Sequence, residues 1–378
     1  SEMGVNVTPF KAQNMSLNAG VGIGGEMAYA QVLQAKACGK MPDVKMNPVL
    51  LKPEDGKTQI VLNGKYFKNI DAENYMNSRK EDLFNIILKD FKYVSERSEL
   101  VLIEGAGSPA EINIKNDLAN MPLARKIGSK NILVSDIDRG GSFASIVGTV
   151  ELLGKDSFSG YILNKFRGSK DLLKDGYDFL LKKYDLKHYG TIPFIENYLP
   201  QEDSLWSWNG KSGKIMVSII KLPHIANATD FHIFSKIKNV GFNFASSPDE
   251  LKNSDLIIIP GSKLTVSDLI SLKKGGFEDK IRELYKEGTR ISNRPFSIIT
   301  SENGRNVKRY DGSTSTKAFG TYFHDIFYNL GFLKKLLNDI AKEKGMEKIN
   351  VNYSLDKEIN SLANLFKKHL DIDSILKD

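Results

Sequence analysis

Acidic and amide side chains follow three apolar runs in the first half of the chain. Glu104 comes after LVLI, Asp136 and Asp138 come after ILVS, and Asn164 and Lys165 come after YIL. A carboxylate at the carboxyl end of a parallel strand can bind Mg²⁺ beside nucleotide phosphates, and an asparagine amide offers both a donor and an acceptor to a purine edge. We therefore predict a nucleotide site in which the three acids are metal ligands and the Asn-Lys pair contacts the nucleotide.

Each of these groups also has a structural interpretation. Glu104 could be a solvated side chain of the turn EGAG, and Asp136 and Asp138 could form an internally salt-bridged turn. Asn164 could close an Asx turn. The functional interpretation of the acids is favoured because strand-end acids occur twice in what reads as one parallel sheet. Which of the two aspartates would bind metal stays open.

A dense polar stretch, KAQNMSLN, follows the first short apolar run. Lys11 could neutralise a transferring phosphoryl group, while Gln13, Asn14 and Ser16 could bind a substrate rich in carboxylates or amides. The alternative is a polar loop without a functional role. We consider it less suitable because so many hydrogen-bonding side chains occur in this one stretch. We predict a catalytic role for Lys11 and substrate contacts for the other three.

In the second half of the chain, His324 stands in AFGTYFHDIF and has the setting of a catalytic base. Such a base needs a cysteine or serine to deprotonate, yet the one cysteine, Cys38, lies far upstream in QAKACGKMP. Gly261 ends the apolar run IIIPG, so its backbone N–H could face an oxyanion. His224 is interpreted as structural. Asp325 follows His324 directly, and the third member of a triad stays unassigned.

The elements that must position these residues are those of an α/β protein. Apolar runs ending in glycine and polar residues are typical of parallel strands that are buried on both faces, and helical patterns such as 24–39 and 79–97 lie between them. The polar segment 200–214 is the best candidate linker. We predict one α/β domain over 1–208, a second over 212–340, and a helical tail over 341–378 that packs on the second domain.

Composition excludes several classes of protein. Forty-one per cent hydrophobic and 26 per cent charged residues describe a soluble globular chain, and no apolar run reaches the roughly 20 residues that span a bilayer. No secretory signal opens the sequence, and a single cysteine suits a reducing cytoplasm. The net charge of +7 comes from lysines interleaved with acids, so we expect neither a nucleic-acid partner nor a membrane partner.

Several long motifs occur in one order: PFKAQNMSLN, GGEMAYAQVLQAKACG, MNPVLLKP, IEGAGSPAEIN, DLANM, DIDRGG, NKFRG, LPHIANATDF, PGSK and AFGTYFHDIF. Together they closely resemble the cobyric acid synthase family of cobalamin biosynthesis. The resemblance implies a dethiobiotin-synthetase-like domain of the P-loop NTPase type followed by a class I glutamine amidotransferase-like domain. It implies amidation of the b, d, e and g carboxylates of adenosylcobyrinic acid a,c-diamide, with ATP, Mg²⁺ and glutamine, through an acyl phosphate and ammonia.

The resemblance also implies roles for single residues. Lys11 resembles the lysine that contacts the phosphates, Glu104 with one of the two aspartates resembles the Mg²⁺ site, and Asn164 resembles the base-recognising asparagine. In the second domain His324 corresponds to the amidotransferase histidine, and Gly261 to the strand end of the oxyanion hole.

Two departures from the family stand out. No G-x-x-x-x-G-K-[ST] phosphate loop occurs in the sequence. Gly288 is followed directly by Thr289, where the family has a strand, the cysteine-bearing nucleophile elbow and a further long segment. We therefore interpret Cys38 as a buried small side chain and expect both catalytic loops to belong to the natural protein, a natural deletion being the alternative. Other interpretations are a non-catalytic corrinoid-binding protein derived by deletion, and the related cobyrinic acid a,c-diamide synthetase.

Overall fold

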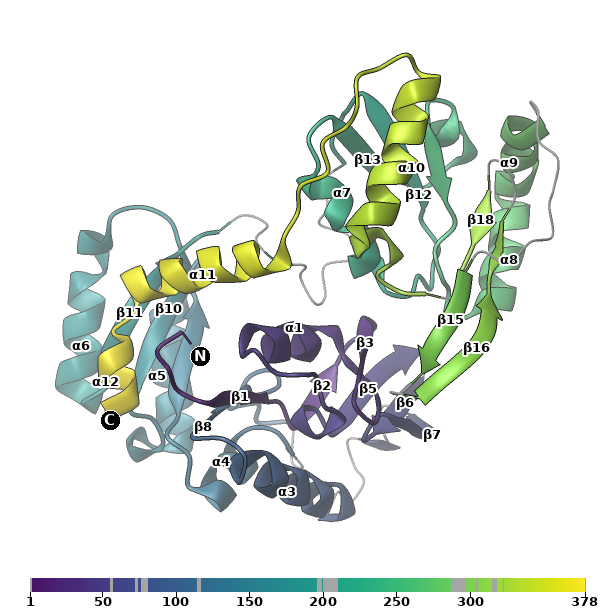
Figure 1. Cartoon of the computed structure of the whole chain (residues 1–378). Helices are drawn as coiled ribbons and strands as arrows, with labels where there is room; N and C mark the ends of the chain where they lie inside the picture. The colour runs from purple at the N-terminus through teal and green to yellow at the C-terminus, as the bar shows by residue number, and fades with distance from the viewer. Residues whose placement is uncertain are drawn as a thin grey trace. The chain divides into compact units, whose positions relative to one another are not determined.

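The computed structural model of the chain describes residues 2–54, 57–71, 74–75, 81–113, 117–195, 199, 210–286, 297–302, 305–314, 318–321 and 323–377. The chain divides into two compact units, one made of Ser1–Gln201 together with Ser354–Asp378, the other of Glu202–Tyr353 (Figure 1). The sequence suggested a boundary slightly later, at 208–212. Both units contain parallel strands and helices, which confirms the predicted α/β fold class.

The first unit is built on parallel strands. β1 (Val7–Phe10) pairs with β8 (Leu100–Ile103), while a second sheet has the order β11 (Lys187–Pro193), β10 (Gly160–Phe166), β9 (Ile132–Asp136). All these pairs are parallel. Glu104 and Asp136 therefore lie at strand ends, as predicted. Asn164 and Lys165 lie inside β10 instead of after it, because β10 continues to Phe166 through an irregularity in its pairing with β11.

A further sheet of the first unit was not predicted. It has the order β2 (Gln13–Met15), β5 (Val49–Glu54), β6 (Lys57–Leu62), β7 (Lys65–Asp71), and the hairpin of β3 (Ala19–Gly22) and β4 (Gly25–Ala28) is a separate pair. The sequence suggested a polar loop at this point, but Gln13–Met15 pairs in parallel with β5. A strand of three polar or flexible residues has no apolar alternation by which it could be recognised.

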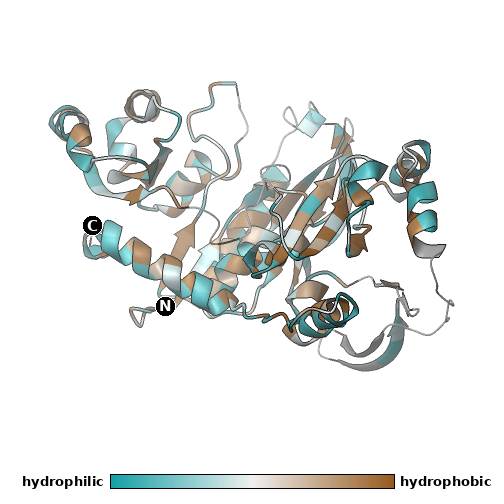
Figure 2. Ribbon diagram, turned by 90° about the horizontal axis from the view of Figure 1, so that it is seen from above, coloured by the Kyte–Doolittle hydropathy of each residue, from teal (hydrophilic) through white to brown (hydrophobic). Residues whose placement is uncertain are grey.

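Helices cover the strands of the first unit: α1 (Tyr29–Ala37), α3 (Glu81–Ser95), α4 (Met121–Ile127), α5 (Ser142–Leu153), α6 (Lys174–Tyr184), α11 (Leu355–His369) and α12 (Ile372–Lys377). In Figure 2 apolar residues concentrate on the strands, whereas the helices also carry hydrophilic residues. Among the helices that the structure describes, none has the length and apolar character needed to cross a membrane.

Helices α11 and α12 lie within the predicted tail 341–378, whose first residues, to Tyr353, belong to the second unit, but the predicted packing of the tail on the second domain is wrong for α11 and α12. Residues 354–378 belong to the first unit. Leu365, Phe366 and Leu370 pack against a cluster formed by Ile162 of β10 and Tyr189 of β11. The apolar face of α11 thereby buries residues of β10 and β11. The sequence pattern of the helix predicts an apolar face but does not show which strands it covers.

The second unit has a parallel sheet in the order β13 (Val240–Ala245), β12 (Ile215–Ile220), β14 (Leu256–Ile258), with α7 (Ile233–Lys236), α8 (Thr265–Lys274), α9 (Phe277–Lys286) and α10 (Leu330–Glu343). β15 (Ser297–Glu302) and β16 (Arg305–Asp311) form a hairpin, as do β17 (Ser313–Thr314) and β18 (Phe319–Gly320). Leu264 occupies the N-cap position of α8, and Thr265 is the first helical residue.

Candidate active site

The centre of the candidate site in the first unit is an ion pair between Lys11 and Glu104. Phe10 and Ile103 are opposite each other in the parallel β1–β8 pair, so the next residues, Lys11 and Glu104, leave the strands side by side. Lys11 Nζ lies 2.8 Å from Glu104 Oε1, and the lysine side chain is 8% exposed against 45% for the glutamate. The ammonium group is thus held in a fixed position, while the carboxylate opens to solvent where a ligand can reach it.

Two glutamines of α1, which the sequence reasoning missed, hold the second oxygen of this carboxylate. Gln34 Nε2 donates to Glu104 Oε2 at 2.6 Å, and Gln31 Nε2 donates to Gln34 Oε1 at 2.9 Å. Gln31 is fully buried. The three-residue spacing puts both amides on one face of the helix, and this pairing of amides on an otherwise apolar helix is the signal that could have revealed them. Their bonds fix the orientation of the carboxylate.

The polar residues predicted to bind substrate have different environments. Gln13 is half-buried and its Oε1 accepts a hydrogen bond from Tyr75 Oη at 2.5 Å. Asn14 and Ser16 are buried. Ser16 Oγ accepts from the Asn18 backbone N–H at 3.0 Å and lies 3.1 Å from the Asn18 carbonyl oxygen. The contacts of Ser16 are therefore those of a local turn, and Gln13 is the most accessible of the three.

A second charged cluster lies at the ends of β9 and β10. Lys165 Nζ donates to Asp136 Oδ2 at 2.7 Å, and Arg167 Nε donates to Asp138 Oδ1 at 2.9 Å. The hydrogen bond from Lys165 is the main reason that the pKa of Asp136 lies below its usual value. Asp136 is therefore an ionised carboxylate at neutral pH, which a metal ligand has to be.

The backbone at Lys165 has an unusual conformation. Its φ is +61°, in the left-handed region that non-glycine residues seldom adopt, and it coincides with the pairing irregularity of β10. Asn164 Oδ1 accepts a hydrogen bond from the Lys165 N–H at 2.9 Å. Such a conformation costs of order 1 kcal/mol and is concentrated at functional sites. It directs Lys165 toward Asp136.

The acids do not form a ready-made metal cage. In the described ranges no group of three or more His, Cys, Asp or Glu side chains has a geometry that could hold a metal ion. Magnesium usually takes only one or two protein carboxylates and completes its coordination with waters and substrate phosphates. The half-exposed Glu104 and the ionised Asp136 suit that kind of site, so the residues present fit Mg²⁺ that is delivered with a nucleotide.

In the second unit, His324 lies beside two residues of the LPHIANATDF motif. His324 Nδ1 is 3.1 Å from Asp230 Oδ2 and 2.8 Å from Asn227 Nδ2. Nδ1 can accept from the Asn227 amide or donate its proton to Asp230, but not both. In the tautomer with the proton on Nδ1 toward Asp230, Nε2 is left as the acceptor, which a general base requires. Sequence reasoning considered only Asp325 as a neighbouring acid. Asp325 instead occupies the N-cap position of the short turn Ile326–Tyr328, with φ +58°.

Cys38 is less buried than the sequence suggested. Cys38 belongs to the first unit, where it is the C-cap of α1 and half-buried, and partial burial raises the pKa of its thiol. In the second unit Gly261 is exposed, and its carbonyl oxygen accepts a hydrogen bond from the Ala226 N–H at 2.8 Å. His224 Nδ1 lies 2.8 Å from the buried carboxylate of Asp268, as a structural histidine would. The predicted junction at 288–290 lies outside the described residues.

Comparisons with known proteins address both units. Residues 1–206 match the family model described as the CobQ/CobB/MinD/ParA nucleotide binding domain, and residues 216–293 match the CobB/CobQ-like glutamine amidotransferase domain. A probable cobyric acid synthase of Thermococcus gammatolerans is 40% identical, over 100% of this chain and 93% of the relative. The cobyric acid synthase of Clostridium tetani is 35% identical, over 99% of this chain and 93% of the relative.

The alignment with the Thermococcus gammatolerans protein also contains internal gaps. It runs over 454 positions, whereas this chain has 378 residues, so at least 76 positions of the relative have no counterpart here. The amidotransferase match ends at residue 293, close to the Gly288–Thr289 junction at which the sequence departs from the family pattern.

Proposed function

The chain belongs to the cobyric acid synthase family, and on that premise we propose that Lys11 and Glu104 form the centre of its ATP-dependent activation site. The protein is an ATP-dependent carbon–nitrogen ligase of cobyric acid synthesis with glutamine as amido donor. The comparisons do not favour the non-catalytic alternative. The observation that supports our assignment is the ion pair of a buried lysine with a half-exposed glutamate at adjacent strand ends.

In the proposed reaction, an oxygen of a corrinoid carboxylate attacks the γ-phosphorus of ATP. The bond to the bridging oxygen breaks, ADP leaves with that electron pair, and an acyl phosphate forms. Ammonia then attacks the acyl carbon, inorganic phosphate leaves, and the proton lost by nitrogen passes to solvent. The b, d, e and g carboxylates of adenosylcobyrinic acid a,c-diamide are the proposed positions.

The residues of the first unit have distinct tasks in these steps. Lys11, fixed by Glu104, neutralises charge that builds up on the transferring phosphoryl group. Glu104 with Asp136 or Asp138 would hold Mg²⁺, which supplies further charge neutralisation. Asn164 and Lys165 bind the nucleotide, and Gln13 orients the side chain of the substrate next to the reacting carboxylate.

His324, oriented by Asp230, is the proposed base for glutamine cleavage, with the Gly261 N–H as an oxyanion donor. We assign the nucleophile to the segment of the family that has no counterpart in this chain. The second unit has a suitable apolar face for such a segment, because α8 exposes Val266, Leu269 and Ile270 at the spacing of one helix face. Ile259, just after β14, is exposed as well.

An assay with two nitrogen donors tests this proposal. The chain, completed with the family's phosphate loop but without the nucleophile segment, is incubated with ATP, Mg²⁺, adenosylcobyrinic acid a,c-diamide and either ammonium or glutamine, and products are resolved by mass spectrometry. We expect carboxyl-to-carboxamide conversion with ammonium and none with glutamine, because Cys38 is a half-buried helix cap. Conversion with glutamine would contradict our assignment of the nucleophile, and no ATP-dependent conversion with either donor would contradict the activation site.

A further inference from the structure

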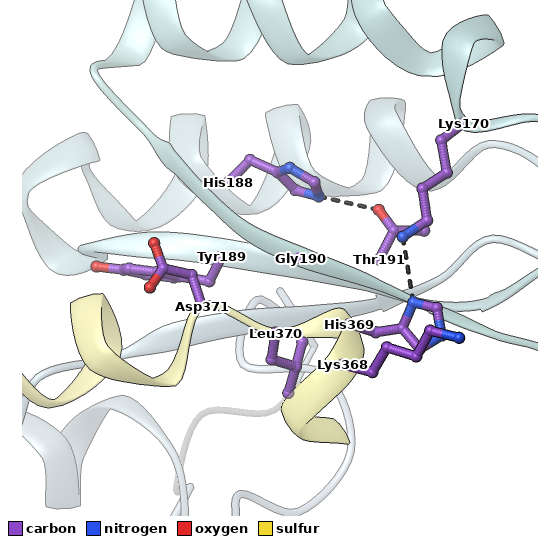
Figure 3. Close-up of a pocket in the computed structure, with 9 residues that line it drawn as sticks. All are labelled: Lys170, His188, Tyr189, Gly190, Thr191, Lys368, His369, Leu370 and Asp371. Atoms are coloured by element: carbon purple, nitrogen blue, oxygen red, sulfur yellow. Dashed lines mark hydrogen bonds between the residues drawn. The ribbon is translucent and has the colours of Figure 1, made fainter. Parts of the chain in front are cut away.

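A pocket in the first unit lies away from the Lys11–Glu104 pair. It has a volume of about 390 Å³ and lies between β11 and the turn that joins α11 to α12 (Figure 3). Its lining residues come from three segments distant in sequence, namely Lys170, the β11 residues 188–191, and residues 368–371 of the C-terminal segment. The function proposed above assigns no role to these residues.

Positive charge gathers at one end of this pocket. Lys170 Nζ lies 3.2 Å from His369 Nδ1, and Lys368 is the neighbouring lining residue. In the described part of the chain, neither lysine forms an ion pair with a carboxylate. Lys367, one residue earlier, does have such a partner in Glu2. Lys170 donates to His369 Nδ1, so the two ammonium groups are the positive charges at this end of the pocket, and an anion placed beside them would neutralise that charge.

Asp371, the one acidic residue among the described residues that line the pocket, forms no ion pair with these lysines. Asp371 Oδ1 accepts a hydrogen bond from the Ser374 N–H at 3.1 Å, which caps the start of α12. In Figure 3 Asp371 lies beside Tyr189, at the opposite end of the pocket from Lys170 and His369. The pocket therefore has its positive side chains at one end and its one carboxylate at the other.

Tight backbone packing fixes the walls that hold the cations. Gly190 and Leu370 form an antiparallel bridge, and the Asp371 N–H donates to the Tyr189 carbonyl oxygen at 2.8 Å. A Cβ added at Gly190 would lie 2.2 Å from the His369 carbonyl oxygen. Thr191 contributes a buried hydroxyl, whose Oγ1 is 2.9 Å from His188 Nε2. The position of the C-terminal cations relative to β11 is thus determined by backbone contacts.

We propose that this pocket binds a doubly charged oxyanion of the phosphate class, held by Lys170 on one side and by Lys368 and His369 on the other. The anion ties the end of α11 to the body of the first unit, in addition to the apolar contacts of α11. A bidentate or bridging oxyanion suits this pocket because Lys170 and Lys368, which both line it, each carry an ammonium group with several hydrogen-bond donors.

The proposed anion would change the titration of His369. Its pKa lies below the usual value because of partial burial first, and then because of Lys170 and Lys368. The charged and titratable groups that line the space around it are Lys170, His188, Tyr189, Lys368 and Asp371. A bound dianion would offset the effect of the two lysines, so the His369 pKa rises when the site is filled.

Binding of inorganic phosphate to the full chain, with chloride adjusted to constant ionic strength, tests the proposal. Calorimetry gives the affinity of the wild type and of Lys170→Gln, Lys368→Gln and the control Lys182→Gln, which changes an exposed lysine of α6 outside the pocket. We expect about tenfold weaker phosphate binding in each pocket variant, because a hydrogen bond to a charged group is lost. The control retains wild-type affinity.

Hydrogen exchange of residues 355–377 locates the binding and distinguishes two sources of phosphate. Protection of this segment by inorganic phosphate alone indicates a free-phosphate site, and protection by ADP alone indicates the phosphate of a nucleotide. Either result supports the pocket, provided that Lys170→Gln abolishes it. No protection with either ligand, or phosphate affinity that is equal in wild type and both pocket variants, would overturn the proposal.

Discussion

Replacing Glu104 with glutamine removes the negative charge beside Lys11 and leaves the size of the side chain unchanged. Loss of one partner of a buried ion pair costs roughly 3–5 kcal/mol, whereas an exposed pair is worth at most about 1 kcal/mol. Lys11 is 8% exposed and Glu104 is 45% exposed, so water screens the pair from one side. We expect the free energy of unfolding of the first unit to fall by about 1–2 kcal/mol, which leaves the protein folded.

The effect of Glu104→Gln on catalysis should be much larger than its effect on folding. The variant loses a carboxylate that would hold Mg²⁺ and no longer fixes Lys11, and one electrostatic group aimed at a reacting centre contributes roughly 10²–10³ to kcat. We expect at least about a hundredfold lower rate of ATP-dependent amidation with ammonium as donor.

The matched control is Glu151→Gln, which changes an exposed glutamate of α5 that bonds Tyr184. Urea unfolding, followed by circular dichroism, reports the stability of each variant, and the ammonium assay reports its activity. A Glu104→Gln variant that amidates as fast as Glu151→Gln would refute our reasoning about the pair.

Three further predictions concern other parts of the chain. Burial lowers the pKa of His232 to about 4, against a usual 6.5. Because the unfolded chain therefore binds the proton at a higher pH than the folded chain, the free energy of unfolding falls by roughly 3 kcal/mol as pH falls from about 6.5 to about 4. In urea unfolding, His232→Phe should remove this pH dependence and the control Lys236→Gln should keep it. Gly190 has φ +146°, and Gly190→Ala would place a Cβ 2.2 Å from the His369 carbonyl oxygen. Since clashes of this kind cost roughly 1–3 kcal/mol, we expect proteolysis of residues 355–377 to become at least about tenfold faster. Unchanged proteolysis would contradict the packing of α11 on β11. The protein isolated from its native source should exceed 42.2 kDa, because we expect the phosphate loop and the cysteine-bearing segment to belong to it, and an intact mass equal to 42.2 kDa would contradict that expectation.

The sequence predicted the strand ends of the first unit better than the pairing of the strands. Apolar runs ending in acids placed Glu104 and Asp136 at strand ends, because a strand buried on both faces has an unbroken apolar pattern. Nothing in that pattern shows which strands become neighbours. The bond from Lys11 to Glu104 depends on the pairing of β1 with β8, which are separated by about ninety residues and brought into register only by the folded sheet.

Other features were out of reach because they depend on tertiary contacts. Asp230 and His324 are far apart in sequence and meet only in the folded second unit. The C-terminal helix α11 packs on β11 through apolar side chains. Their helical spacing predicts an apolar face but does not identify the strand that this face contacts. The left-handed conformation of Lys165 has no signal in residue type, since glycine or asparagine is the usual occupant of that region.

The most direct test of the proposed carboxylate activation follows oxygen atoms. Adenosylcobyrinic acid a,c-diamide with ¹⁸O-enriched carboxylates is amidated with ATP and ammonium, and the released phosphate is analysed by mass spectrometry. Attack of a carboxylate oxygen on the γ-phosphorus requires that each amide formed leave one labelled oxygen in inorganic phosphate. Amide formation with unlabelled phosphate, or with AMP as the nucleotide product, would contradict the mechanism that we assign to the Lys11–Glu104 site.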